Sequence, residues 1–126
     1  MPVKIEWFQD ESKAEDFPKG TTIFAEGDKG TTMYVLLRGA VELHIGGEVF
    51  EVLGPGEPFG EMALIDRAPR NATAVTRTPC KIVPVEMDQF RSLVRLEPDF
   101  AVAIMKVMAD RLRRMDARAM EKPKKG

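Results

Sequence analysis

Residues 59–73 read FGEMALIDRAPRNAT and set two acidic and two basic side chains, among them Glu61 and Arg70, into a mostly apolar run. Glu61 directly follows a glycine, and Arg70 directly follows a proline. The stretch lies between two strand-like regions, where a roll of antiparallel strands needs only a tight turn. An ordered segment that is longer than a turn requires is usually functional. The sequence therefore places a candidate binding loop here.

The residue types in this loop suit a ligand that carries both a phosphate and hydroxyl groups. Gly60 lets a ligand approach the backbone closely, and the free N–H groups at the start of a short helix bind anions. Arg70 presents a planar fork that matches two oxygens of one phosphate, whereas the Glu61 carboxylate accepts hydrogen bonds from hydroxyls. This combination indicates a sugar phosphate or a nucleotide. The residues alone leave a second interpretation open, in which Glu61 and Arg70 form an ion pair that closes the loop.

On both sides of the loop, short β-rich runs alternate with turn residues. In chain order these runs are residues 21–25, MYVLLRG, VELHI, EVFEVLG, ATAVTRT and CKIVPVE. Gly46-Gly47, between the third and fourth runs, predicts a two-residue hairpin. At least six closely spaced strands predict a mainly β protein, an antiparallel β jelly roll (double-stranded β-helix). A short N-terminal helical segment and two C-terminal helices complete the expected fold.

The sequence changes character after residue 86, where two helices are expected. Asp88 is expected to cap a helix through Leu96, because aspartate accepts hydrogen bonds from the N–H groups of a first helical turn. Pro98 is suited to the first turn of the next helix. From there to about Met120 the chain has no glycine or proline, which predicts a helix of about six turns.

This last helix carries two apolar faces. Phe100, Ile104 and Val107 lie on one face and are expected to pack on the roll. A second set steps alternately by four and three residues, as in a coiled coil. Because the roll covers only one side of so long a helix, we expect a parallel homodimer through this second face. It consists of Ala101, Met105, Met108, Leu112, Met115 and Ala119.

Composition narrows the class of protein. A chain of 126 residues with 44% hydrophobic and 31% charged residues fits one domain. No run approaches the roughly 18 apolar residues of a membrane span, and no secretory signal is visible, so we expect a cytoplasmic protein without a membrane partner. The single cysteine, Cys80, allows no internal disulfide, and the single histidine, His44, allows no histidine-rich metal site. No metal, cofactor or catalytic residue is expected, and hence no enzyme.

The sequence resembles the cyclic nucleotide-binding domain family, of the catabolite activator protein and protein kinase A regulatory subunit type. FGEMALIDRAPRNATA is similar to the phosphate-binding cassette of that family, roughly F-G-E-[LM]-A-L-[LI], a short gap and P-R-[STA]-A-T. FPKGTTIFAEGD, MYVLLRGAVEL and LGPGEPFGE resemble the strands that precede this cassette. The likeness extends from residue 17 to about residue 116.

The resemblance implies a 3′,5′-cyclic nucleotide as ligand and gives each cassette residue a role. Glu61 and the Gly60 backbone would hold the ribose 2′-hydroxyl. Arg70 would neutralise the cyclic phosphate, with the backbone N–H groups of Ala63 and Asn71. The expected ligand-binding residues are Gly60, Glu61, Met62, Ala63, Leu64, Arg70, Asn71 and Ala72. The expected base contacts on the last helix are Met108, Arg111 and Leu112.

Asn71 departs from the family pattern, which has serine, threonine or alanine at this position. Its amide both donates and accepts hydrogen bonds, so cyclic AMP and cyclic GMP both stay open. We favour cyclic AMP because it is the commoner bacterial ligand. Leu64 would pack beneath the sugar and the base.

The expected organisation is one cyclic nucleotide-binding domain over residues 1–126. It divides into an N-terminal segment (1–16), a β-roll (17–86), C-terminal helices (87–120) and a basic tail (121–126). No DNA-binding segment is expected in this chain. The predicted function is a stand-alone sensor that shifts its C-terminal helices on binding and acts on an effector protein of unknown identity. The alternative is a degenerate domain that keeps the fold as an interaction or dimerisation module and binds no nucleotide.

Overall fold

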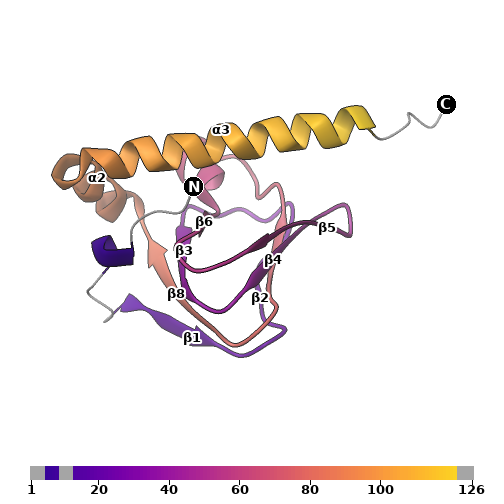
Figure 1. The fold of residues 1–126 in the computed structure, drawn as a ribbon, viewed down its shortest axis with the longest axis horizontal. Coiled ribbons are helices and arrows are strands. Elements are labelled where there is room, and N and C mark those ends of the chain that lie inside the picture. The colour runs from indigo at the N-terminus through magenta and orange to yellow at the C-terminus, as the bar shows by residue number, and fades with distance from the viewer. Residues whose placement is uncertain (1–4, 9–12, 122–126) are drawn as a thin grey trace.

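The computed structural model describes residues 5–8 and 13–121, a roll of β strands with helices along one side (Figure 1). In chain order the elements are a 3-10 helix η1 (Ile5–Phe8), β1 (Glu15–Phe17), β2 (Thr22–Phe24), β3 (Met33–Arg38), β4 (Val41–Ile45), β5 (Glu48–Leu53), β6 (Pro58–Phe59), α1 (Glu61–Asp66), β7 (Thr73–Thr76), β8 (Cys80–Val85), α2 (Met87–Leu96) and α3 (Pro98–Glu121). Among these residues no helix is both long enough and apolar enough to cross a membrane. The predicted basic tail lies outside the described residues, apart from the end of α3.

The strands form two four-stranded sheets, in the orders β1-β8-β3-β6 and β2-β7-β4-β5. All the strand pairs are antiparallel. This arrangement confirms the predicted mainly β fold with a short N-terminal helical segment and two C-terminal helices. Gly46 and Gly47 join β4 to β5 with φ angles of 60° and 82°, the left-handed values that a two-residue hairpin requires. The predicted hairpin is therefore confirmed.

Two short strands were missed by the sequence prediction. β1 adds three residues along β8, and β6 pairs two residues with β3. Strands this short show no alternation of apolar and polar residues, and β6 follows directly on a glycine- and proline-rich turn. Because β1 begins at Glu15, the roll starts before residue 17, where we placed its boundary.

The interior holds two apolar clusters, one on each side of β3. Leu36 faces the cluster between the sheets, whereas Met33 and Val35 face a second cluster beneath α2 and α3. Successive strand residues point to opposite faces, so one strand serves both clusters. The buried members between the sheets are Phe24, Leu36, Val41, Leu43, Leu53, Phe59, Ala72, Ala74, Cys80 and Ile82. Those beneath the helices are Phe8, Met33, Val35, Leu64, Val83, Val85, Phe100 and Ile104.

The start of α2 differs from the prediction. The helix begins at Met87, and Glu86 is its N-cap rather than Asp88. The Glu86 side chain binds the backbone of Gln89, and the Gln89 side chain accepts a hydrogen bond from the Glu86 N–H at 3.0 Å. This reciprocal pair satisfies two backbone donors at once, which Asp88 alone cannot do. Asp88 lies one position inside the first turn.

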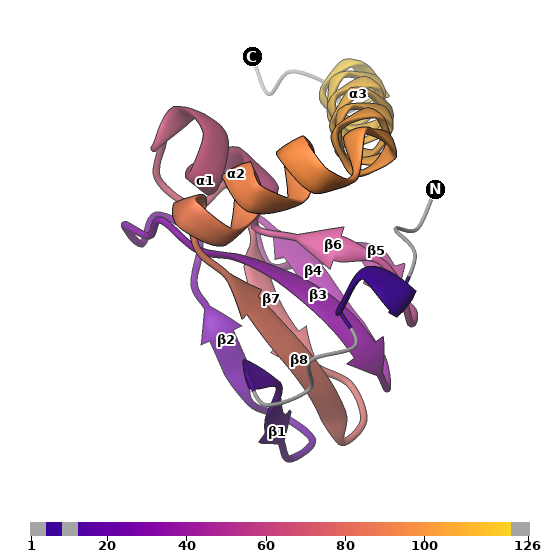
Figure 2. The same ribbon diagram turned by 90° about the vertical axis from the view of Figure 1, so that its left-hand side faces the viewer.

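α3 extends along the whole side of the roll, and its N-terminal half adjoins α2 (Figure 2). Phe100, Ile104 and Val107 are buried, as the sequence predicted. The fold positions α3 so that its middle turns lie over α1, the short helix of the candidate loop.

The predicted partner-facing stripe of α3 is split in the structure. Met105 and Leu112 are 59% and 50% exposed, as expected for a stripe that awaits a partner. Met108 instead packs on the cluster beneath the helices, and Met115 turns toward the roll. Val102, which the heptad spacing omitted, is 44% exposed. The exposed stripe therefore consists of Val102, Met105 and Leu112, because Met108 and Met115 are turned toward the rest of the protein.

Candidate functional site

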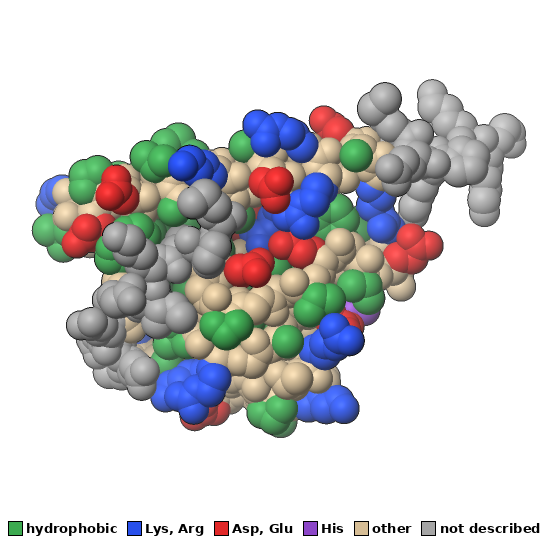
Figure 3. All heavy atoms as spheres, in the orientation of Figure 1, with side chains coloured by type: hydrophobic (Ala, Val, Ile, Leu, Met, Phe, Trp, Pro, Cys, Tyr) green, Lys and Arg blue, Asp and Glu red, His purple; other side chains and the backbone are tan. Residues whose placement is uncertain are grey.

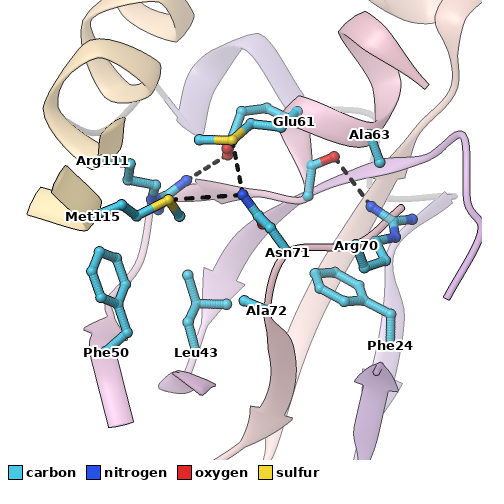
Figure 4. A pocket seen from close by; sticks show the side chains of 12 residues that line it. Phe24, Leu43, Phe50, Glu61, Ala63, Arg70, Asn71, Ala72, Arg111 and Met115 are labelled. Carbon is cyan, nitrogen blue, oxygen red and sulfur yellow. Dashed lines mark hydrogen bonds and ion pairs between the residues drawn. The ribbon is translucent and has the colours of Figure 1, made fainter. Parts of the chain in front are cut away.

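A pocket lies between the candidate loop, the strands β2, β4 and β5, and α3. One end contains Arg70 beside Phe24, and the other end contains Arg111, Met115 and Phe50 (Figure 4). The lining residues are Phe24, Leu43, Phe50, Gly60, Glu61, Met62, Ala63, Arg70, Asn71, Ala72, Arg111 and Met115. The loop thus supplies the middle of the pocket, as its unusual length suggested.

Gly60 sets the turn that brings the loop into the pocket. Its φ of +76° is left-handed, and an added Cβ would lie 2.7 Å from Nη1 of Arg70. Both conditions require glycine here. Gly60 is also the N-cap of α1 and offers no side chain to the first N–H groups of that helix. These donors therefore depend on other acceptors.

Arg70 is 6% exposed and is held by backbone and ring contacts rather than by a carboxylate. Its Nη1 donates to the Gly60 carbonyl at 3.2 Å, and its Cζ lies 4.3 Å from the centroid of the Phe24 ring. Its Nε is buried and has no hydrogen-bond partner among the described residues. Burial lowers the pKa of Arg70 from its ordinary value, because desolvation penalises the charged form. An unpaired buried N–H costs about 1–3 kcal/mol, so this donor is expected to serve an acceptor that is not part of the chain.

The loop between β2 and β3 fixes the backbone of Arg70. The Arg70 N–H donates to the Asp28 carbonyl at 2.8 Å, and the Gly27 N–H donates to the Arg70 carbonyl at 2.7 Å. Gly30 lies against the guanidinium itself, since an added Cβ there would lie 2.4 Å from Nη2. The guanidinium is therefore packed between two glycines and an aromatic ring, which leaves its side chain little freedom.

Glu61 is 3% exposed, and its partner is Arg111 of α3, whose Nη1 donates to Oε1 of Glu61. Burial raises the pKa of Glu61, and the Arg111 guanidinium opposes that rise. The alternative that Glu61 and Arg70 form an ion pair is therefore wrong for the described structure. The reason is geometric: α3 brings Arg111 against the carboxylate, while Arg70 lies beside Phe24 (Figure 4) and donates to the Gly60 carbonyl.

The end of the pocket nearest α3 is mostly apolar. Leu43, Phe50, Met62 and Met115 line it, together with the polar side chains of Asn71 and Arg111. Asn71 Nδ2 lies 3.0 Å from the sulfur of Met62 and 3.8 Å from the sulfur of Met115, which are weak acceptors. Little free space remains between these side chains. A ligand of nucleotide size therefore requires them to move apart.

The structure brings most of the predicted site residues together. Gly60, Glu61, Met62, Ala63, Arg70, Asn71 and Ala72 all line the pocket. Arg111 also lines it, although its contact is with Glu61 and no base is needed to explain it. Leu64, Met108 and Leu112 lie elsewhere. Leu64 is 1% exposed in the cluster beneath the helices, Met108 packs on that cluster, and Leu112 is half exposed.

Four lining residues were missed, for two different reasons. Phe24, Leu43 and Phe50 belong to strands whose apolar residues all look alike in the sequence, and nothing singled them out. Met115 was recognised but was assigned to the partner-facing stripe. Among the described residues, no three histidine, cysteine, aspartate or glutamate side chains are grouped so that they could hold a metal ion.

A family model described as cyclic nucleotide-binding domain matches residues 14–97. The chain is 36% identical over 104 residues to the CRP-like cAMP-activated global transcriptional regulator of Mycobacterium tuberculosis, which covers 79% of this chain and 46% of that protein. It is also 36% identical over 105 residues to the cyclic AMP receptor protein of Thermus thermophilus. That match covers 79% of this chain and 49% of the relative. The chain thus spans about half the length of the curated relatives that it matches.

Solved structures are similar in fold as well. The Thermus thermophilus catabolite activator protein superposes with a TM-score of 0.76 at 31% identity, over 93% of this chain and 59% of that one. A protein kinase A regulatory domain, described as PKAR CBD2 bound to Sp-2Cl-cAMPS, gives a TM-score of 0.67 at 25% identity. That alignment covers 82% of this chain and 71% of the other.

Proposed function

The chain belongs to the cyclic nucleotide-binding domain family, and we propose that its pocket binds a 3′,5′-cyclic nucleotide, with cyclic AMP preferred over cyclic GMP. The observation that carries the proposal is the buried, unpaired Nε–H of Arg70. A phosphate oxygen at this position would accept that hydrogen bond and neutralise a guanidinium that burial has made costly. The proposed role is binding and signalling without catalysis.

Glu61 suits the ribose in this arrangement. Arg111 occupies one of its oxygens, and an ionised carboxylate has acceptor sites on both oxygens, so capacity remains for a ribose hydroxyl. Arg111 also offsets the desolvation that favours the neutral carboxyl group. Arg111, which we expected to contact the base, would thus support the sugar contact through Glu61 instead.

Asn71 and the apolar end of the pocket are suited to the base. Met62 and Met115 are flexible, polarizable side chains that can move aside and then contact a ring face. Asn71 offers one donor group and one acceptor to the edge of a purine. The preference for cyclic AMP rests on the names of two relatives, a cAMP-activated regulator and a cyclic AMP receptor protein.

We infer that binding changes the position of α3. Met115 and Arg111 both come from α3, and little free space remains in the pocket until the side chains at its apolar end separate. A ligand that wedges between α1 and α3 binds the separated arrangement better and shifts the population toward it. The exposed stripe of Val102, Met105 and Leu112 would transmit this change to a second copy of the chain. The effector, the cytoplasmic location and the single-domain organisation stay predictions.

The second candidate function is an interaction module that binds no nucleotide. The small free space in the pocket and the internal partner of Glu61 favour it. This second function does not account for the buried Nε of Arg70, which has no hydrogen-bond partner among the described residues.

Isothermal titration with cyclic AMP, cyclic GMP and linear 5′-AMP separates the two functions. We expect cyclic AMP to bind more tightly than cyclic GMP, and linear 5′-AMP to bind most weakly because its phosphate is not held against the ribose ring. A folded protein that gives no heat with either cyclic nucleotide would contradict the proposed binding and favour the interaction module.

A further inference from the structure

Glu51 lies outside the pocket, on β5, and one of its oxygens contacts two arginines of α3. Arg111 Nε donates to Oε1 of Glu51 at 3.1 Å, and Arg114 Nη2 lies 3.2 Å from the same oxygen. The Glu51 side chain is 10% exposed, so these contacts are partly protected from solvent. Figure 3 shows acidic and basic side chains interleaved where α3 crosses the roll.

Arg111 therefore stands between two carboxylates. Its Nε contacts Glu51, and its Nη1 contacts Glu61 in the pocket. The guanidinium is planar and rigid, so a contact that fixes Nε also fixes the direction in which Nη1 points. The position of Glu51 thus determines how Arg111 meets Glu61.

We propose that Glu51 is a positioning residue of the nucleotide pocket, which acts through Arg111 to hold Glu61 ready for the sugar hydroxyl. The inference rests on the proposed function and names a residue that neither the cassette pattern nor the pocket lining includes. Without Glu51, the Arg111 side chain would keep its charge but lose the contact that orients it. Glu61 would then meet the ligand with a less ordered partner.

Removing Glu51 affects Arg111 more than Arg114. Arg114 has a second partner, Asp110, at 2.9 Å one turn earlier on α3. Arg114 is also 42% exposed and can be solvated, whereas Arg111 is 3% exposed. The effect of a Glu51 substitution is therefore expected to reach the pocket rather than end at the surface.

Glu48 provides a matched control on the same strand and helix. Its Oε2 accepts a hydrogen bond from Arg118 Nη2 at 2.8 Å, so it also ties β5 to α3. Neither Glu48 nor Arg118 lines the pocket. A general weakening of the contact between β5 and α3 would appear in both Glu48 and Glu51 variants, whereas a positioning role appears only at Glu51.

The test is isothermal titration of the full chain with cyclic AMP, in parallel with thermal melting. We expect Glu51→Ala to weaken the affinity about tenfold, the scale of one hydrogen bond to a charged group. Glu51→Gln should restore most of the affinity, because its amide oxygen still accepts the hydrogen bond from Nε. Glu48→Ala should leave the affinity unchanged, even where it lowers the melting temperature.

A double-mutant cycle tests whether Glu51 acts on the pocket through Arg111. In an Arg111→Ala background, Glu51→Ala should cause no further loss of affinity, because both substitutions remove the same contact. The inference is overturned if the folded Glu51→Ala variant binds cyclic AMP like the wild type, or if Glu48→Ala loses as much. Absence of binding by the wild type itself would overturn the proposed function, and the inference with it.

Discussion

Arg111 of α3 and Glu61 of α1 form a buried ion pair inside the pocket, although 50 residues separate them in the chain. The pair joins the helix that begins the candidate loop to the helix that carries the exposed apolar stripe. Any ligand that contacts Glu61 therefore also acts on α3. Under the proposed function, this link would let a ligand in the pocket change the exposed stripe of α3.

Arg70→Ala is expected to weaken cyclic AMP binding by about 100-fold or more, because charge-assisted hydrogen bonds to the phosphate are lost. Arg70→Lys should recover only part of this, since an ammonium group lacks the planar fork. Titration calorimetry measures both. Arg77→Ala is the control, because Arg77 is exposed, follows the end of β7 and pairs with Glu42 of β4. The melting temperature of ligand-free Arg70→Ala should change little, as the substitution also removes an unpaired buried donor.

Affinity for cyclic AMP is expected to fall as the pH is lowered from neutral. Burial raises the pKa of Glu61 above its ordinary value of 4.5, with Arg111 opposing and Glu51 on β5 adding to the rise. The sugar hydroxyl is held best by the ionised carboxylate, so protonation of Glu61 weakens binding. Glu61→Gln should bind more weakly than the wild type at neutral pH and show a flatter profile. If the affinities of the wild type and of Glu61→Gln for cyclic AMP fall in parallel as the pH is lowered, Glu61 is not the group that holds the sugar hydroxyl.

Stability of the ligand-free protein should change with pH in the opposite direction. A carboxyl group whose folded-state pKa is raised favours folding at low pH, and that contribution is lost as the pH rises from 4.5 through the folded-state pKa. The free energy of unfolding of the wild type, relative to Glu61→Gln, should therefore decrease over this interval. Urea unfolding of both proteins at a series of pH values measures the difference.

Gly30→Ala should weaken binding through Arg70 alone. An added Cβ would lie 2.4 Å from Nη2 and 2.7 Å from Nε of Arg70, so the guanidinium must shift. We expect a loss of about tenfold in affinity, because misplaced donors make poorer charge-assisted hydrogen bonds. Gly54→Ala is the matched control, since nothing lies within 4 Å of its added Cβ. Equal affinities of Gly30→Ala and Gly54→Ala would show that cyclic AMP binding does not depend on the position of the Arg70 guanidinium.

Leu112→Glu is expected to convert a dimer into a monomer. Leu112 is 50% exposed on the stripe of α3, and a carboxylate there would be buried against an apolar partner surface. Val49→Glu introduces the same charge at a residue of β5 that is 49% exposed, and it should leave the dimer intact. Light scattering coupled to size-exclusion chromatography gives the molar mass of each. A monomeric wild type at micromolar concentration would rule out pairing through this stripe.

The sequence was sufficient for features that depend on local chemistry. Gly46-Gly47 predicted a hairpin, the cassette predicted the pocket, and the run without glycine after Pro98 predicted α3. Each of these follows from residues that are neighbours in the chain, so no knowledge of packing was needed.

Contacts between helices and strands that are distant in the chain could not be predicted from the local sequence. The ion pair that the sequence left open for Glu61 was with Arg70, nine positions along the chain, because nothing local pointed to Arg111 on a distant helix. Leu64 was placed under the ligand, although α1 turns it into the cluster beneath the helices. Met115 fitted a heptad pattern equally well whether it faced a partner or the pocket. In all three cases the packing of a helix against the roll, α3 for Arg111 and Met115 and α1 for Leu64, decided the outcome.

The most direct test of the central claim is a crystal structure of the protein with cyclic AMP. The account predicts a phosphate oxygen within hydrogen-bond distance of Arg70 Nε, which has no hydrogen-bond partner among the described residues, and a ribose hydroxyl on the Glu61 carboxylate. A structure in which the nucleotide binds elsewhere, with Nε of Arg70 still unpaired, would contradict it.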